Sequence, residues 1–252
     1  MKKRPHRLST GTRSSFLTIA TGLVLAVVVG PLCLAREIAP NPSLSAPLCP
    51  LDKKADSRIM AFYQETRSLA GKGLKFNDKW LPRNESQAWV MDCSGTICYL
   101  FKEVAGIVLP RMASDQYLCL QRQGKAWDIP DTKGNVAAQR AYLREHLKPG
   151  DLLFWENTCL PCHEPPITHA MIFLGCNKQG KSIMAGSQTA QRIPGLFTGR
   201  RGGVDIYIYD PTDNIGGYVT PQLIFQMGHL HAYGRPLEAD PVKLAEAISK
   251  LP

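Results

Sequence analysis

The chain has 252 residues, of which 44% are hydrophobic and 20% are charged, a composition typical of a globular protein and incompatible with wholesale disorder. Its eight Cys are too few for a small disulfide-dense scaffold. Residues 1–35 hold five basic side chains and no acidic one, so the formal net charge of +9 falls to +4 for the rest of the chain. This balance excludes a strongly basic nucleic-acid-binding protein, and we expect no nucleic-acid partner.

The first 35 residues have the pattern of an export signal. A basic stretch over residues 1–13 precedes an apolar run over residues 16–35, and the small residues Cys33 and Ala35 occupy the positions that a signal peptidase inspects. We therefore predict a signal peptide over residues 1–35 and a protein of the periplasm or cell envelope. The alternative is an uncleaved anchor, because about 20 apolar residues can span a bilayer. Only in that case do we expect contact with a membrane.

The next segments are a linker and a first helix. Residues 36–54 are rich in Pro and are predicted to form the linker. The apolar spacing over residues 53–71 predicts an amphipathic helix. Residues 72–91 have no such spacing and are expected to form a loop.

Two further helices are predicted in the first half of the chain. The clearer one begins after Asp92, a good N-cap residue, and ends at Gly106. Residues 107–134 show no regular pattern. Another helix is predicted from after Asn135 to about Leu147, before a Lys-Pro-Gly sequence that ends it.

The second half of the chain changes to short apolar runs, which predict β-strands. These runs cover residues 151–155, 167–174, 182–185, 204–209 and 230–233. A tail over residues 238–252 is predicted to hold a short helix, because Pro241 suits the first helical position. Helices followed by an antiparallel meander indicate an α+β domain, which we assign to residues 55–237.

Cys93 is the first candidate for chemistry, because it directly follows the predicted N-cap. A thiol at a helix start lies beside unpaired backbone N–H groups, which favour the reactive thiolate and can stabilise an oxyanion. Asp92 and Ser94 are candidates for shaping this site, and Gly95 is expected to keep it open to a peptide. The alternative is a structural or disulfide-bonded cysteine, which the cysteine count alone favours.

A thiolate nucleophile needs a base, and His169 is the best candidate. It lies in a predicted strand whose alternate residues from Ile167 to Phe173 share one face. We expect this face to point toward the helices and toward Cys93, which would pair a Cys nucleophile with a His base. The alternative is a histidine that is simply satisfied in the core. His163 is a rival base in a Pro-flanked loop that would position it poorly.

The order and spacing of these motifs over roughly residues 55–235 resemble the NlpC family of papain-like cell-wall peptidases. The residues that carry the resemblance are Asp92, Cys93, Ser94, Gly95, Phe101, Ile107 to Arg111, Gln116, Lys148 to Phe154, His169 and Gly175. The resemblance implies a papain-like domain in which N-terminal helices pack on an antiparallel sheet.

The resemblance also implies an activity: an exported cysteine peptidase that hydrolyses peptidoglycan stem peptides between D-γ-glutamate and a diamino acid, with no metal or organic cofactor. Cys93 would attack the carbonyl, and His169 would deprotonate the thiol and later protonate the leaving amine. A related amidase or another papain-like hydrolase would use the same pair. The alternative from a different functional class is a catalytically impaired module that binds murein.

The chain departs from the family pattern at a third polar residue, which orients the histidine. Counting along the strand that follows His169 puts Met184 at this place, and a Met side chain cannot orient an imidazole. Gln188 is our candidate replacement and Ser187 is a shorter one, and the alternative is that both are ordinary loop residues. Phe76 stands near the place where the family tends to have a Tyr.

The loop over residues 156–166 contains the pattern of a c-type haem attachment site. The residues of this pattern are Cys159, Cys162 and His163. Haem needs a pocket and usually a second axial ligand, so we favour a disulfide within the loop or to another cysteine. With Cys93 free, the six other cysteines that follow the signal would suffice for three bridges. Cys98 and Cys176 have an alternative role as small buried apolar residues.

Two pairs of residues are weaker candidates. Arg200 and Arg201 lie in a Gly-rich loop and are candidates for guiding the carboxylates of a stem peptide, although a solvated loop is the favoured interpretation. His229 and His231 share one face of the last predicted strand. A metal would need further ligands there, so we predict a solvated strand edge and no metal site.

Overall fold

The structure is a computed structural model, and the residues that it describes are 57–132, 134–161, 163–177, 180–189, 192–193, 196–197 and 202–251. The predicted signal peptide and linker lie outside these residues. Within the described ranges, no helix is both long enough and apolar enough to cross a membrane.

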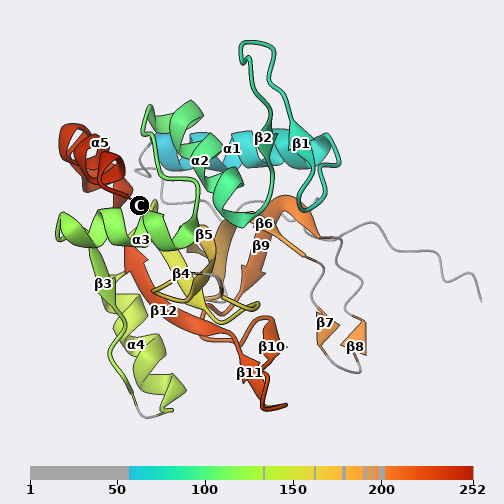
Figure 1. Cartoon of the computed structure of the whole chain (residues 1–252), viewed down its shortest axis with the longest axis vertical. Helices are drawn as coiled ribbons and strands as arrows, with labels where there is room; N and C mark the ends of the chain where they lie inside the picture. The colour runs from blue at the N-terminus through green and yellow to red at the C-terminus, as the bar shows by residue number, and fades with distance from the viewer. Residues whose placement is uncertain are drawn as a thin grey trace, which may run out of the picture. The chain divides into compact units, whose positions relative to one another are not determined.

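A six-stranded antiparallel sheet lies at the centre of the fold, with the strand order β3-β12-β4-β5-β6-β9 (Figure 1). The strands are β3 (Ala126–Asp128), β4 (Leu152–Glu156), β5 (Ile167–Cys176), β6 (Ser182–Gln188), β9 (Gly203–Tyr209) and β12 (His229–Gly234). Strands β4, β5, β6 and β9 form the predicted meander. The last strand instead returns to the other side of β4, where it pairs with both β4 and β3. Residues 232–234 are therefore internal to the sheet, whereas His229 pairs only with β4 and is exposed.

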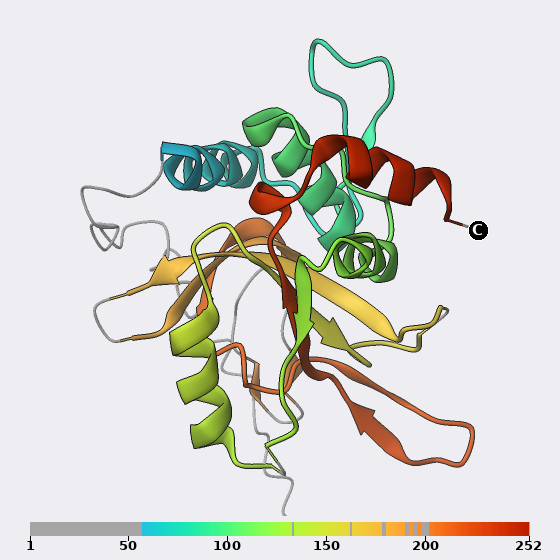
Figure 2. The same ribbon diagram turned by 90° about the vertical axis from the view of Figure 1, so that its left-hand side faces the viewer.

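Small two-stranded pairs accompany this sheet. They are β1 (Lys79–Trp80) with β2 (Trp89–Val90), β7 (Arg192–Ile193) with β8 (Leu196–Phe197), and β10 (Gly217–Val219) with β11 (Phe225–Met227). The β1–β2 pair lies in the stretch that was expected to be a loop. The β10–β11 hairpin projects away from the large sheet (Figure 2).

The helices are α1 (Ser57–Gly71), α2 (Cys93–Ala105), α3 (Ala113–Arg122), α4 (Val136–His146), a 3-10 turn (Pro236–Glu238) and α5 (Pro241–Ser249). Helices at the positions of α1, α2 and α4 were predicted from spacing and caps. Helix α3 was missed, because its N-cap residue Met112 makes no side-chain cap bond to any described residue. Its stability comes from burial of residues such as Tyr117 and Leu120 against the sheet. Mixed helices and antiparallel strands confirm the predicted α+β class.

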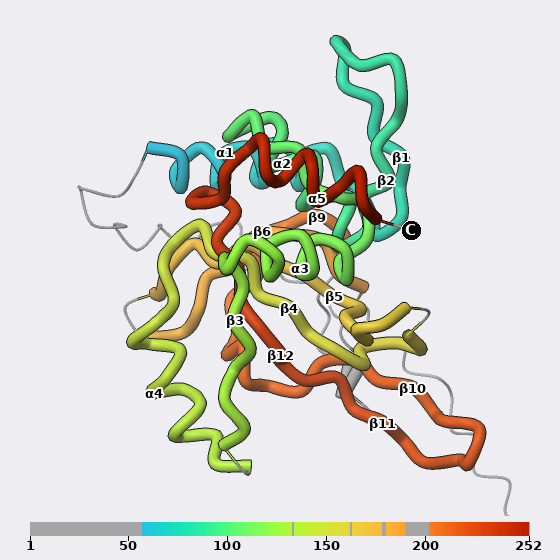
Figure 3. Tube along the Cα trace, turned by 60° about the vertical axis from the view of Figure 1, so that its left-hand side comes forward, coloured from blue at the N-terminus to red at the C-terminus, as the bar shows by residue number. Residues whose placement is uncertain are grey.

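The two faces of the sheet are covered differently (Figures 2 and 3). Helices α1, α2, α3 and α5 lie over one face, which we call the helix face, and α4 lies over part of the other, which we call the α4 face. The helix face buries Phe154, Ala170 and Ile172 in a cluster with α2 and α3 residues. The α4 face buries Trp155 and Met171 in a second cluster, together with Leu143 of α4. Alternate strand residues therefore belong to separate cores.

Candidate active site

Cys93 is the first residue of α2, as predicted from the N-cap. The Asp92 carboxylate accepts a hydrogen bond from the backbone N–H of Gly95 at 2.8 Å, which begins the helix at this point. A Cβ atom on Gly95 would lie 2.0 Å from the carbonyl oxygen of Val90. Gly95 therefore allows the end of β2 to pack on the first turn of α2. Its expected role in admitting a peptide stays a prediction.

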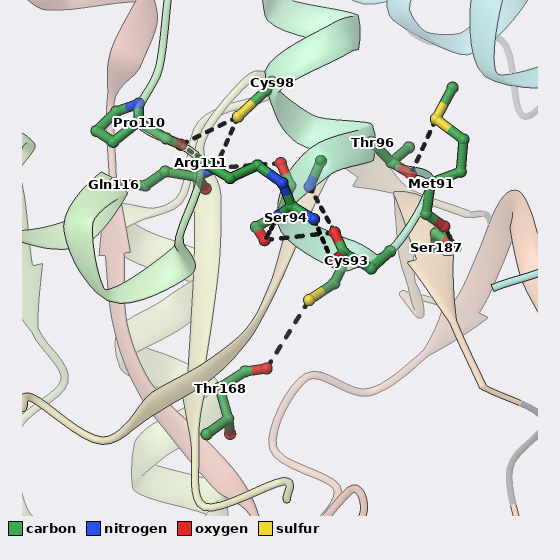
Figure 4. Close-up of polar contacts among 12 residues, drawn as sticks. Met91, Cys93, Ser94, Thr96, Cys98, Pro110, Arg111, Gln116, Thr168 and Ser187 are labelled. Carbon is green, nitrogen blue, oxygen red and sulfur yellow. Dashed lines mark hydrogen bonds and ion pairs between the residues drawn. The ribbon is translucent and has the colours of Figure 1, made fainter. Parts of the chain in front are cut away.

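The start of α2 enters a gap between β5 and β6. Pairing of these strands ends at Ile172 and Ala185, whereas β6 stays paired with β9 as far as Gln188. In the gap, the Ser187 hydroxyl donates a hydrogen bond to the Met91 carbonyl at 2.8 Å (Figure 4). The segment leading into α2 thus takes the place of β6 beside this part of β5.

The sulfur of Cys93 lies against the backbone of β5 on both sides of His169. Its thiol donates to the carbonyl oxygen of Thr168 at 3.8 Å (Figure 4), and the backbone N–H of Ala170 bonds to the sulfur. His169 itself is paired with Trp155 across the other edge of β5. The fold therefore brings together two residues that are 76 positions apart in the sequence.

The side chain of His169 lies on the α4 face, and the prediction that it points toward the helix layer is wrong. Its ring lies 5.5 Å from the ring of Trp155, which belongs to the α4-face cluster. Strand alternation places Met171 and Phe173 on this same face, as predicted. The prediction is wrong for Ile167, which lies in the helix-face cluster because the register shifts between His169 and Ile167. The site therefore forms where the start of α2, on the helix face, enters the gap between β5 and β6. There it lies close to His169, whose side chain is on the α4 face.

Both groups of this pair are neutral near pH 7. Burial, and then the negative charge of Asp92, raise the pKa of the Cys93 thiol to about 11. Burial lowers the pKa of the His169 imidazole to about 4. A helix N-terminus contributes only about 0.3–1 kcal/mol, less than the 1.4 kcal/mol that corresponds to a change of one in pKa. The backbone hydrogen bond at the helix start lowers the pKa of Cys93, as predicted, but burial outweighs it and the thiol form is favoured.

Arg111, in the loop after α2, contacts the start of that helix. Its guanidinium forms an ion pair with Asp92 and donates to the Ser94 hydroxyl at 2.8 Å. The amide of Gln116 donates to the Ser94 carbonyl oxygen at 3.2 Å and to the Pro110 carbonyl oxygen at 3.0 Å. Asp92 and Ser94 lie beside Cys93, but their polar groups are largely occupied by these contacts with Arg111 and Gln116.

The register of β5 and β6 changes the interpretation of the third polar residue. Met184 pairs with Phe173, four residues from His169 or about 13 Å along the strand. Continuing the same register would put Gln188 opposite His169. The side-chain oxygen of Gln188 accepts a hydrogen bond from the Tyr209 hydroxyl at 3.5 Å. The Nε2 atom of His169 is buried and has no hydrogen-bond partner among the described residues.

The cysteines differ in burial and state. Cys98 and Cys119 are buried free thiols in the described part of the chain, so the three predicted bridges are not formed. Cys98 has the predicted role of a small buried residue, but Cys176 is exposed. Cys159 is also exposed, and its charge contributes to raising the pKa of Cys93.

The other predicted candidates do not join the site. His163 is exposed in its loop. His229 and His231 both contact the Glu156 carboxylate, with N–O distances of 2.6 and 2.9 Å. Across the described ranges, no group of three His, Cys, Asp or Glu side chains is arranged to hold a metal. Cys162, Arg200 and Arg201 lie outside the described residues.

Several contacts that build the site were not predicted from the sequence. The family resemblance included Arg111 and Gln116, but no role was assigned to them. The contacts of Thr168, Ser187 and Trp155 depend on pairing between distant segments, and no local pattern of the sequence indicated them.

Comparisons with known proteins identify similar sequences. Residues 80–193 match the model of the NlpC/P60 family. Over 87 residues, or 34% of the chain, the sequence is 32% identical to the gamma-DL-glutamyl hydrolase of Bacillus subtilis (strain 168). The matched segment spans 16% of the length of that curated relative.

Proposed function

We propose that this protein is an exported cysteine peptidase acting on peptidoglycan stem peptides, because residues 80–193 match the model of the NlpC/P60 family. The proposed bond is that between D-γ-glutamate and a diamino acid. The similarity to a gamma-DL-glutamyl hydrolase supports a γ-glutamyl bond. The basic and apolar pattern of residues 1–35 supports export to the periplasm or cell envelope.

One observation carries the proposal: the Cys93 sulfur contacts the carbonyl oxygen of Thr168 and the N–H of Ala170, which flank His169 in the chain. The Nε2 atom of His169 is buried and has no hydrogen-bond partner among the described residues. A cysteine beside the strand segment that carries a histidine supports the proposed pairing of a Cys nucleophile with a His base.

The neutral state of both groups indicates how the reaction proceeds. Cys93 attacks the peptide carbonyl carbon as its thiol proton passes to the imidazole of His169, which becomes an imidazolium. The carbonyl oxygen takes the negative charge beside the first backbone N–H groups of α2. The imidazolium then gives its proton to the leaving amine, and the thioester is hydrolysed by water. No step needs a resident thiolate.

A murein-binding module that lacks turnover is the second candidate. The observation that favours it is the absence of any described polar partner for His169, because a general base is usually oriented by a third group. Such a module would bind stem peptides in the same place. Another papain-like amidase or hydrolase would use the same residues on a different bond.

The test is digestion of purified muropeptides, with the products identified by mass spectrometry. We expect the wild-type protein to cut between D-glutamate and the diamino acid, and we expect Cys93→Ala to abolish cutting. Cys119→Ala is the matched control, because it removes another buried free thiol, from α3, and should retain activity. Cutting at another bond would change the enzyme class. No cutting by protein with a reduced Cys93 would favour the binding module.

A further inference from the structure

The imidazole of His169 is held by an aromatic side chain where a polar one would be expected. Trp155 is fully buried and pairs directly with His169 between β4 and β5. The two ring centroids lie 5.5 Å apart, with the planes tilted by 55°. Gln188, the predicted orienting residue, instead accepts its hydrogen bond from Tyr209.

Trp155 is itself fixed in place. Its indole N–H donates a hydrogen bond to the Pro211 carbonyl oxygen at 3.1 Å, in the loop that follows β9. The Tyr209 ring lies 6.4 Å from the indole. The β4–β5 register also shifts immediately after the pair formed by Trp155 and His169, and the next pair is Glu156 with Ile167. A ring that is bonded at one edge and packed within a core has little freedom to rotate.

We propose that Trp155 is the positioning residue for His169, so that the indole restricts the imidazole to the orientation that receives the proton of Cys93. This inference rests on the proposed function. One physical effect carries it. Packing against a fixed ring removes the rotational freedom that a hydrogen bond to a third polar residue would otherwise remove.

The variants for the test are Trp155→Leu and Trp155→Phe. Phe173→Leu is the matched control, because Phe173 is a buried aromatic residue in the same α4-face cluster. We expect Trp155→Leu to lower kcat on a stem peptide by about 100-fold, as for a misplaced reacting group, with KM unchanged. Trp155→Phe should recover much of this loss, because it restores a ring without the bond to Pro211. Melting temperatures of all three variants would show whether they are equally folded.

A second measurement needs no turnover. The NMR signal of the His169 imidazole, assigned by its loss in His169→Gln, is followed against pH. Cys93 and Asp92 at the start of α2 are the titratable groups beside this imidazole, with Tyr209 behind Trp155, and none of them is changed. We expect the imidazole in Trp155→Leu to titrate at a higher pH than in the wild type, because water then reaches it.

The outcomes separate the two proposals. If kcat in Trp155→Leu falls no further than in Phe173→Leu and the titration does not move, Trp155 has only a structural role and the inference is overturned. If the wild-type protein shows no turnover, the proposed function fails. The titration then decides alone, since a shift in Trp155→Leu that is absent from Phe173→Leu supports the positioning role.

Discussion

The helix face and the α4 face of the central sheet supply different halves of the candidate site. The helix face supplies Cys93, held at the start of α2 by contacts with Val90, Ser187 and Arg111. The α4 face supplies His169, held in an apolar cluster beside Trp155. Polar contacts thus hold the segment that carries Cys93, whereas apolar packing surrounds His169. The comparison teaches that burial at a junction of two cores favours the neutral form of both groups.

The largest expected effect comes from breaking the close contact between the first turn of α2 and the end of β2. In Gly95→Ala, the new methyl group would meet the Val90 carbonyl at 2.0 Å, and neither backbone segment can move away cheaply. We expect the free energy of unfolding to fall by about 3 kcal/mol. Chemical denaturation measures this change.

Gly71→Ala is the control for that substitution. Nothing lies within 4 Å of a Cβ at Gly71, at the end of α1, so its stability should change by no more than about 0.5 kcal/mol. Equal effects of the two substitutions would contradict the close approach of β2 to α2.

Two buried titratable groups, His169 and Asp151, should change the stability in opposite directions as the pH falls. Burial lowers the pKa of His169 to about 4 and raises the pKa of Asp151, at the start of β4, to about 6. Between pH 6 and 4 the unfolded chain binds more protons than the folded one at His169, so stability is lost as the pH falls. At Asp151 the folded chain binds more protons, so stability is gained as the pH falls. The two contributions oppose each other in the wild type.

Single variants should separate these contributions. Between pH 6 and pH 4, His169→Gln should gain free energy of unfolding relative to the wild type, and Asp151→Asn should lose it, each by up to about 3 kcal/mol. Denaturant titrations at the two pH values measure the difference. If both variants followed the wild-type profile, the buried state of these groups would be refuted.

Ser187→Ala tests the attachment of the helix start within the gap between β5 and β6. The substitution removes the hydroxyl that donates to the buried Met91 carbonyl, and we expect a loss of about 2 kcal/mol in stability. The alkylation rate of Cys93 should also change, because the segment before it is no longer held. Ser182→Ala, at the other end of β6, is the matched control and should leave that rate unaltered.

The smallest expected effect concerns the charge beside the thiol. Asp92 raises the pKa of Cys93, and the ion pair with Arg111 offsets part of this negative charge. Arg111→Gln should therefore raise that pKa further and slow alkylation of Cys93 at pH 8 by up to about tenfold, which corresponds to a change of one in pKa. Arg122→Gln, at the end of α3, is the control. Faster alkylation in Arg111→Gln would contradict the inference that Arg111 offsets the negative charge of Asp92.

The sequence by itself determined the features that depend on near neighbours in the chain. The cap at Asp92 and the stop at Gly106 specified α2 and hence the place of Cys93 at its start. The period-two pattern of β5 specified that His169 shares a face with Met171. These features follow from local hydrogen bonds and side-chain direction, so a short segment is enough to predict them.

Only the tertiary structure decided which face receives the helices, which residues meet across strands, and how deeply the site is buried. Helix α3 forms mainly because its apolar side packs on the sheet, so its weak caps did not reveal it. Met184 was assigned by counting, but the β5–β6 register puts it beside Phe173. The same burial, supplied by segments far apart in sequence, outweighs the helix start and keeps the thiol of Cys93 protonated. These outcomes depend on long-range pairing, which a pattern of neighbouring residues does not encode.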